Sequence, residues 1–244
     1  MEDAKVRLYV DHDLGEGQSV PLARDQAHYL FGVMRLGMGD SVKLFNGRAG
    51  EWLARVVEAG KRGGVLECTA QSRPQMNPPD LWLLFAPIKK ARTDFIVEKA
   101  TEMGASRISP VQTRFTNAER IRRDRLQAHA VEAAEQCGGT FVPAVDDLQK
   151  LDAVLSAWPH DRQLMFCDEA LADGTPAPGL IPAYKANKWA ILIGPEGGFC
   201  EAERTRLHKL PFAHPIRLGP RILRADTAAV AALALWQHTL GDWT

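Results

Sequence analysis

A short apolar strand that ends in a glycine-rich loop constrains this chain more than any other stretch. Ala190–Ile193 is a continuous apolar run, typical of a strand buried on both faces of a sheet. The run stops at the loop 194–198, Gly-Pro-Glu-Gly-Gly, and a helix-like stretch follows at 201–210. Open α/β sheets present backbone N–H groups to a ligand at such a junction. The stretch therefore predicts an α/β sheet with a ligand site at the loop.

A second loop segment lies downstream, Ile216-Arg-Leu-Gly-Pro-Arg-Ile-Leu-Arg-Ala-Asp-Thr227. We expect the two loops to be walls of one site. The loop at 194–198 is not a P-loop, because no Gly-Lys-Ser/Thr follows to hold phosphate and magnesium. It also lacks the dinucleotide pattern G-x-G-x-x-G. Nucleotide binding of those two kinds is disfavoured, and a purely structural turn stays open as an alternative at this point.

The composition is typical of a globular protein, and the chain has no net positive charge that would attract nucleic acid to its whole surface. It has 244 residues, 45% hydrophobic and 25% charged, with a formal net charge of +0, so basic patches would act locally. The four cysteines lack metal-ligand spacing, which argues against a zinc site or a disulfide framework. The N-terminus resembles no targeting signal, and no apolar run reaches transmembrane length. We expect a cytoplasmic protein that needs neither a metal nor a membrane.

The first part of the chain has the pattern of a small β-rich domain. Strands are expected at 7–10, 41–45, 52–57 and 64–69, and Gly-rich turns between them predict a small barrel. A helix is expected from Asp25 to Met34, with one apolar face that consists of Ala27, Leu30, Phe31 and Met34. Three prolines then interrupt regular structure. We therefore divide the chain into a barrel domain 1–72, a linker 73–80 and a second domain 81–244.

From residue 81 the pattern changes to strands that alternate with helices, which predicts a mainly parallel sheet. The strands are expected at 81–86, 107–111, 163–167 and 190–193. A basic loop at 87–92 is expected to lead to a helix that starts at Thr93 or Asp94 and ends near Met103. Further helices are expected through Ala134, over 201–210 and over 226–240.

Two groups of charged residues are candidates for chemistry. Arg221, Arg224 and Asp226 lead into the last helix. Asp226 either caps that helix or handles a proton while an arginine holds a polar substrate. Basic residues also cluster at 89–92 and 120–125, where they either form a solvated face or contact nucleic-acid phosphates.

The ordered motifs resemble the RsmE family of ribosomal RNA methyltransferases, within the SPOUT class. Ile193-Gly-Pro-Glu-Gly-Gly-Phe199 and Leu218-Gly-Pro-Arg-Ile-Leu-Arg224 carry the resemblance. Further matches are His28-Tyr-Leu-Phe-Gly-Val-Met-Arg35, Glu98-Lys-Ala-Thr-Glu-Met-Gly104 and Ala133-Ala-Glu-Gln-Cys-Gly138. The motifs span nearly the whole chain in the order of the family.

The resemblance implies an α/β fold with two parts. These are an N-terminal PUA-like RNA-binding β-barrel and a C-terminal SPOUT α/β domain with a deep trefoil knot and a mainly parallel sheet. It also implies a homodimer that uses S-adenosylmethionine to methylate N3 of one uridine, uracil-1498, in 16S ribosomal RNA of the small subunit. A SPOUT enzyme that methylates a ribose 2′-oxygen and a non-catalytic RNA-binding protein stay open as alternatives.

The chemistry of uracil N3 sets requirements on the site. N3 carries a proton, so the site needs a proton acceptor, donors for the developing charge on the carbonyl oxygens, and alignment. Arg224 is the candidate for stabilising the uracil anion or its phosphate, and Asp226 or Glu196 for accepting the proton. The residues expected at the cofactor are Cys167, Ile193, Gly194, Glu196, Gly197, Gly198, Leu218, Gly219, Ile222 and Leu223. Those expected at the RNA are His28, Arg35, Lys89, Lys90, Arg92, Arg114, Arg122 and Arg123.

The chain departs from the family pattern at two positions. Arg224-Ala-Asp-Thr227 stands where the family usually has Arg-Thr-Glu-Thr, so Asp226 keeps the carboxylate on a shorter side chain. Gly139 stands where the family commonly has an arginine, which removes a candidate contact to RNA or to the dimer partner.

Overall fold

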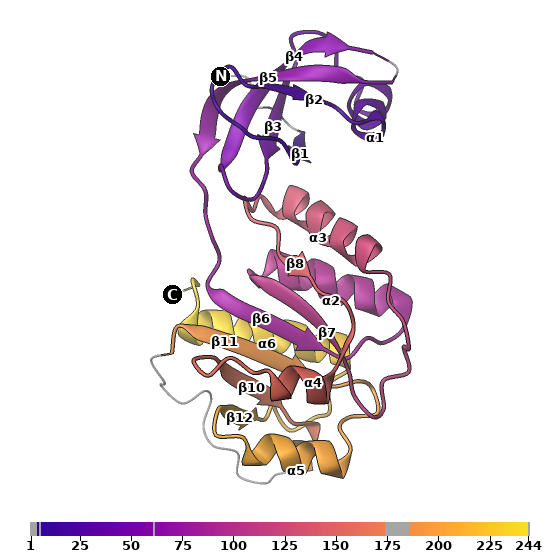
Figure 1. The fold of residues 1–244 in the computed structure, drawn as a ribbon, viewed down its shortest axis with the longest axis vertical. Helices are drawn as coiled ribbons and strands as arrows, with labels where there is room; N and C mark the ends of the chain where they lie inside the picture. Colours follow the sequence, from indigo (N-terminus) through magenta and orange to yellow (C-terminus); the bar gives the residue numbers. More distant parts are fainter. Residues whose placement is uncertain (1–3, 5, 61, 174–185, 244) are drawn as a thin grey trace. The chain divides into compact units, whose positions relative to one another are not determined.

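A computed structural model describes residue 4 and residues 6–60, 62–173 and 186–243. The chain separates into two compact units, which are coloured along the sequence in Figure 1. The first consists of Met1–Asn77 and Ala134–Val142, and the second of Pro78–Ala133 and Pro143–Thr244. The first unit therefore includes a segment that is distant in sequence from its strands.

The first unit is built on a five-stranded mixed sheet that forms a half-barrel. The strand order is β1 (Arg7–Tyr9), β3 (Ser41–Phe45), β4 (Glu51–Ala59), β5 (Gly64–Arg73) and β2 (Ser19–Pro21). β1 runs parallel to β3 and the remaining pairs are antiparallel. Alternate residues such as Val42, Leu44 and Val56 point into one core, as the period of a half-buried strand requires. The predicted β-rich domain is confirmed, and β2 is a strand that the prediction missed.

The helix predicted over 25–34 has two parts. α1 (Arg24–Ala27) is α-helical and continues directly into a π-helical segment, η1 (His28–Val33). Ala27 and Leu30 are buried, whereas Met34 is 40% exposed and does not belong to the apolar face predicted for it. The wider π-helical turn shifts the positions that face the core, which a pattern based on 3.6 residues per turn does not anticipate.

A buried ion pair stands inside the first unit. Arg7 Nε donates to Glu51 Oε2 at 2.6 Å, and the side chains of Arg7 and Glu51 are 13% and 1% exposed. The same guanidinium donates to the backbone carbonyl oxygens of Ala134, Glu135 and Gly139. Burial alone would raise the pKa of Glu51, but the hydrogen bonds from Arg7 and Ser72 outweigh it, so the net pKa is lowered. Gly139 thus contributes its carbonyl group to this network.

The second unit contains a sheet in which every pairing between strands is parallel, as predicted. The strand order is β12 (Ala213–Ile216), β10 (Gln163–Cys167), β11 (Lys188–Ile193), β6 (Asp80–Phe85), β7 (Arg107–Gln112) and β8 (Ala144–Val145). A short strand β9 (Gln149–Lys150) also pairs with β7. The prediction missed β8, β9 and β12, because strands this short leave little periodic signal.

Helices cover both faces of this sheet, so the interiors of its central strands β6, β10 and β11 are apolar. They are α2 (Lys90–Glu102), α3 (Arg123–Cys137), α4 (Leu151–Ser156), α5 (Glu201–Lys209) and α6 (Ala225–Leu240), with a 3-10 turn η2 (Glu169–Asp173). Leu155 of α4 and Leu207 of α5 pack with Leu84, Phe166 and Leu192 on one face. On the other face α6 packs on β11 and against α2 (Figure 1). Within the described residues, no helix is long and apolar enough to cross a membrane.

Two helix starts differ from the prediction. α2 begins at Lys90, one turn before Thr93, so part of the predicted basic loop is helical. The Thr93 side chain instead reaches back into the loop, where its hydroxyl accepts from the Ile88 N–H at 3.0 Å. The N-cap of α6 is Arg224, and Asp226 lies inside the first turn, where it accepts from the Thr227 N–H at 2.9 Å. Of the two roles considered for Asp226, capping of this helix is therefore wrong.

Candidate functional site

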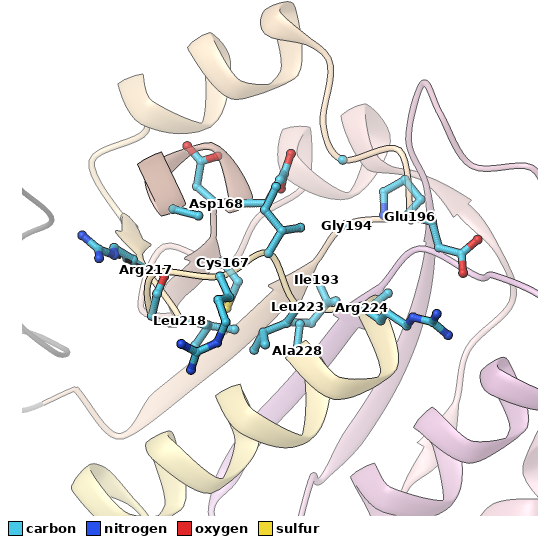
Figure 2. A pocket seen from close by; sticks show the side chains of 18 of the residues that line it. Cys167, Asp168, Ile193, Gly194, Glu196, Arg217, Leu218, Leu223, Arg224 and Ala228 are labelled. Carbon is cyan, nitrogen blue, oxygen red and sulfur yellow. Dashed lines mark hydrogen bonds between the residues drawn. The ribbon is translucent and has the colours of Figure 1, made fainter. Parts of the chain in front are cut away.

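The carboxyl ends of the parallel strands enclose a cavity of about 470 Å³. Its walls are the ends of β10 and β11, the loop 194–198 and the segment 216–225, together with residues from the starts of α2 and α6. Figure 2 shows Ile193, Leu218, Leu223 and Ala228 grouped at the apolar wall. The two loops singled out in the sequence therefore do share one cavity, at the sheet edge where open α/β folds bind ligands.

Most residues predicted for the cofactor line this cavity. They are Cys167, Ile193, Gly194, Glu196, Gly198, Leu218, Gly219, Ile222 and Leu223. Gly197 does not line it. A side chain added at Gly197 would instead meet Phe115, whose Cβ would be 3.3 Å away.

Two glycines of the loop leave no room for a side chain. A Cβ at Gly194 would lie 2.7 Å from the ring of Phe199. Gly198 has a φ of +70°, and a Cβ there would collide with the Glu169 carboxylate. Glu169 Oε1 also accepts from the Phe199 N–H at 2.9 Å, which ties the loop to the start of η2. The loop conformation therefore depends on the absence of side chains at these positions.

Asp168 and Glu169 are site residues that the sequence prediction missed. Both line the cavity, and Asp168 is 3% exposed. Its carboxylate accepts from Arg204 Nε at 3.1 Å and lies 2.8 Å from His208 Nε2, both on α5. A usable signal was present, since the two carboxylates directly follow the strand predicted at 163–167. Polar groups at the carboxyl end of a parallel strand point to a ligand site.

Glu196 and Arg224 lie toward one end of the cavity, and Arg217 and Asp168 lie toward the other (Figure 2). Arg92 Nη1 donates to Glu196 Oε1 at 2.7 Å, and Arg92 Nε lies 3.6 Å from Asp226 Oδ2. Asp226 does not itself line the cavity. The Arg224 guanidinium makes no hydrogen bond or ion pair with the described residues, so it is available to a ligand.

The other predicted RNA contacts are spread over both units. Lys89 lines the cavity, and Lys90 is exposed at the first position of α2. Arg114 and Arg122 are exposed between β7 and α3, and Arg123 is exposed at the first position of α3. His28 and Arg35 belong to the first unit, where Arg35 has a positive φ of 58° at the end of η1.

Cys167 is a buried thiol in the cavity wall. Burial, and secondly the charge of Glu169, raise its pKa well above the ordinary value for cysteine. We expect a maleimide reagent to label exposed Cys137 in the native protein and to label Cys167 only after unfolding, because the thiolate is the reactive form. Peptide mass spectrometry would measure this, with Cys137→Ser as the control. Rapid native labelling of Cys167 would contradict the burial argument.

Comparison with known proteins decides the family. The RNA methyltransferase domain family matches residues 75–237. The chain belongs to this family. The RNA methyltransferase PUA domain family matches residues 22–67, within the first unit. Both matches agree with the fold described above, a PUA-like domain joined to an α/β methyltransferase domain.

Members of the family with names and solved structures align along almost the whole chain. Ribosomal RNA small subunit methyltransferase E of Rickettsia conorii is 29% identical over 229 residues, which cover 93% of each protein. The enzyme of the same name from Neisseria gonorrhoeae, bound to S-adenosyl methionine, superposes with a TM-score of 0.88 at 26% identity, covering 98% of this chain and 99% of that one. A methyltransferase from Legionella pneumophila with bound SAM gives a TM-score of 0.83 at 25% identity, covering 97% and 98%. The resemblance to the RsmE family is confirmed.

Proposed function

We propose that this chain transfers a methyl group from S-adenosylmethionine to N3 of one uridine, uracil-1498, in 16S ribosomal RNA of the small subunit. The observation that carries the proposal is the cavity between the loop 194–198 and the segment 216–225, with Arg224 and Glu196 at one end. Its relatives are named for methylation of small-subunit ribosomal RNA, and two similar structures contain the methyl donor.

The cavity fits the donor in shape and in chemistry. Ile193, Leu218, Ile222 and Leu223 offer apolar surface for an adenine ring, and the glycines of the loop let backbone groups approach a ribose. The Glu169 carboxylate, directly after β10, adds a hydrogen-bond acceptor to the lining, whereas the buried Asp168 carboxylate is occupied by Arg204 and His208. Bound S-adenosylmethionine supplies a sulfonium-activated methyl group, so no metal is required.

Charged side chains at and beside the cavity are proposed to remove the proton from uracil N3. As the bond from N3 to the methyl carbon forms and the carbon–sulfur bond breaks, N3 must lose its proton. Glu196 or Asp226 accepts that proton, and Arg92, between the two carboxylates, orients both. Arg224 donates to the uracil oxygens, where negative charge develops.

The remaining parts of the proposal concern organisation. The barrel domain 1–72 and the basic residues of domain 81–244, on either side of the linker 73–80, hold the RNA backbone. His28 and Arg35 contribute from the first of these, and Lys89, Lys90, Arg114, Arg122 and Arg123 from the second. We further propose a cytoplasmic homodimer whose second domain contains a deep trefoil knot.

The experiment that tests the function is methylation of small ribosomal subunits from a strain that lacks this activity. Radiolabelled donor is supplied, and the modified nucleoside is identified by mass spectrometry. N3-methyluridine at a single position is the expected product. A ribose-methylated nucleoside would indicate a 2′-O enzyme instead, and no incorporation by a protein that still binds RNA would indicate a non-catalytic RNA-binding protein.

Gly198→Ala is expected to weaken S-adenosylmethionine binding. A non-glycine residue at positive φ costs about 1–3 kcal/mol, and the new methyl group would also displace Glu169 from the loop. The free loop can leave the binding conformation to escape this cost, and ligand binding must then restore it, so the affinity measured by calorimetry should fall by up to roughly 150-fold, since 1.4 kcal/mol is a factor of ten. Gly39→Ala is the control, because Gly39 has a φ of +87° but open space around it. Unchanged affinity in Gly198→Ala would contradict the role of this loop.

A further inference from the structure

A buried carboxylate behind the wall of the cavity is held by two side chains of α5. Asp168 lines the cavity, but its side chain has no exposed surface. Arg204 donates through Nε to Asp168 Oδ1 at 3.1 Å and through Nη2 to Oδ2 at 3.4 Å. His208, one turn further along α5, places its Nε2 2.8 Å from Oδ2. The Asp168 carboxylate is therefore turned toward the protein and is not available to a ligand.

The same residue fixes the turn at the start of η2. Asp168 Oδ1 accepts from the Ala170 N–H at 3.1 Å, and the Asp168 carbonyl oxygen accepts from the Leu171 N–H at 3.2 Å. Glu169 lies inside this turn, and its Oε1 accepts from the N–H of Phe199, directly after the glycine-rich loop. The turn therefore sets where the Glu169 carboxylate reaches the first wall of the cavity.

The second wall of the cavity is joined to the same point. The Asp168 N–H donates to the carbonyl oxygen of Ile216, where the second wall begins, at 3.2 Å. The Phe166 ring makes edge-to-face contacts with His208 and with Phe199, at centroid distances of 5.7 and 5.1 Å. Both walls of the cavity and α5 therefore meet around Asp168.

We infer, on the basis of the proposed function that puts the methyl donor in this cavity, that Asp168 is a positioning residue for S-adenosylmethionine. Through it Arg204 and His208 hold the two walls in the arrangement that binds the donor. Desolvation offsets much of the attraction in a buried ion pair, so such a pair fixes geometry more than it adds stability. Glu196 and Arg224 lie toward the opposite end of the cavity (Figure 2). Loss of the Asp168 carboxylate should therefore weaken donor binding and leave the chemical step largely unchanged.

Asp168→Ala tests the inference in the complete protein, with unmethylated small subunits as methyl acceptor. Without the tether the walls occupy the binding arrangement for only part of the time, which raises the apparent Kd in proportion. The Kd from calorimetry and the KM for S-adenosylmethionine should rise roughly 10- to 100-fold, with kcat at saturating donor within a few-fold of wild type. Asp168→Asn should give intermediate values, because it keeps an acceptor for the Ala170 N–H but loses the charge that holds the α5 side chains.

Two ion pairs of α5 provide a matched control. Arg204→Ala removes a partner of Asp168 and should also weaken donor binding. Arg206→Ala removes the partner of Asp152, whose side chain is 74% exposed and which does not line the cavity. Arg206→Ala and Asp152→Ala should therefore bind the donor with the affinity of wild type. If Asp168→Ala does not fold, the comparison of Arg204→Ala with Arg206→Ala decides the question, and equal Kd values in these two variants would overturn the inference.

The remaining outcomes separate positioning from a merely structural role. A structural role of Asp168 would lower the fraction of folded protein, so the calorimetric stoichiometry and kcat would fall while the Kd stayed at the wild-type value. That result would overturn the inference. If wild type itself binds no S-adenosylmethionine, the proposed function fails and the inference fails with it. A raised Kd at full stoichiometry, with kcat retained and the Kd partly recovered in Asp168→Asn, supports the inference.

Discussion

Arg224→Ala is expected to abolish methyl transfer while S-adenosylmethionine still binds within a few-fold of the wild-type affinity. Removal of one donor from a developing oxyanion lowers kcat by about 10²–10³-fold in other enzymes. Arg224 has no competing hydrogen bond or ion pair within the described residues, so its loss leaves no buried partner unsatisfied. The variant should therefore fold normally and show its effect in the chemical step. Single-turnover methylation and calorimetry measure the two quantities separately.

Two further variants make the result for Arg224 specific. Arg224→Lys keeps the charge but loses the planar fork, so we expect intermediate activity. Arg206→Ala removes an arginine of α5 that pairs with Asp152 away from the cavity, and it should behave like wild type. Full activity in Arg224→Ala would show that another group stabilises the uracil anion. A large loss of donor affinity would instead place Arg224 in cofactor binding.

Arg7→Met is expected to destabilise the first unit by about 3–5 kcal/mol, the usual cost of removing one partner from a buried ion pair. The substitution leaves Glu51 buried without its cation, and it removes the donor from the carbonyl oxygens of Ala134, Glu135 and Gly139. Amide hydrogen exchange in β1, β3 and β4 should become faster by the factor that corresponds to this loss of free energy of unfolding. Exchange in β10 and β11 of the second unit serves as the internal reference.

An exposed ion pair in the same unit serves as a control that separates the effect of burial on stability from the effect of charge pairing alone. Arg48 pairs with Asp11 and Asp13, and all three side chains are more than half exposed, at 52%, 86% and 91%. Arg48→Met should therefore change stability far less than Arg7→Met, because water screens an exposed ion pair. Equal effects of Arg7→Met and Arg48→Met would show that the buried network adds little to the stability of the unit.

The Glu51 network also predicts a pH dependence. The folded-state pKa of Glu51 is lowered, so its ionised form contributes stability above the unfolded-state pKa, and that contribution is lost as pH falls through the folded-state pKa. Glu51→Gln should therefore be less stable than wild type at neutral pH, and the difference should shrink at acid pH. Urea unfolding between neutral and acid pH measures the difference. A constant difference would show that Glu51 is not ionised in the folded protein.

Local sequence patterns were sufficient to locate the central strands of the parallel sheet and the end of α2. Apolar runs located β6, β10 and β11 because a strand buried on both faces has apolar residues at every position. Gly104, with a φ of +76°, ended α2 close to the predicted position. Helix starts were less predictable. Lys89 and Arg224 have no side-chain caps, so packing and loop contacts decide where α2 and α6 begin.

The sequence by itself determined the loop 194–198 and the segment 216–225 that line the cavity of the second unit, because a strand, a glycine loop and a helix are read from consecutive residues. Only the tertiary structure decided which side chains from other parts of the sequence contact these two segments. Arg92 reaches Glu196 across 104 positions, and Glu169 reaches Phe199 across 30. Phe115 lies against Gly197 for the same reason. Strand order in the parallel sheet sets these neighbours, and that order depends on long-range packing of side chains that no local pattern records.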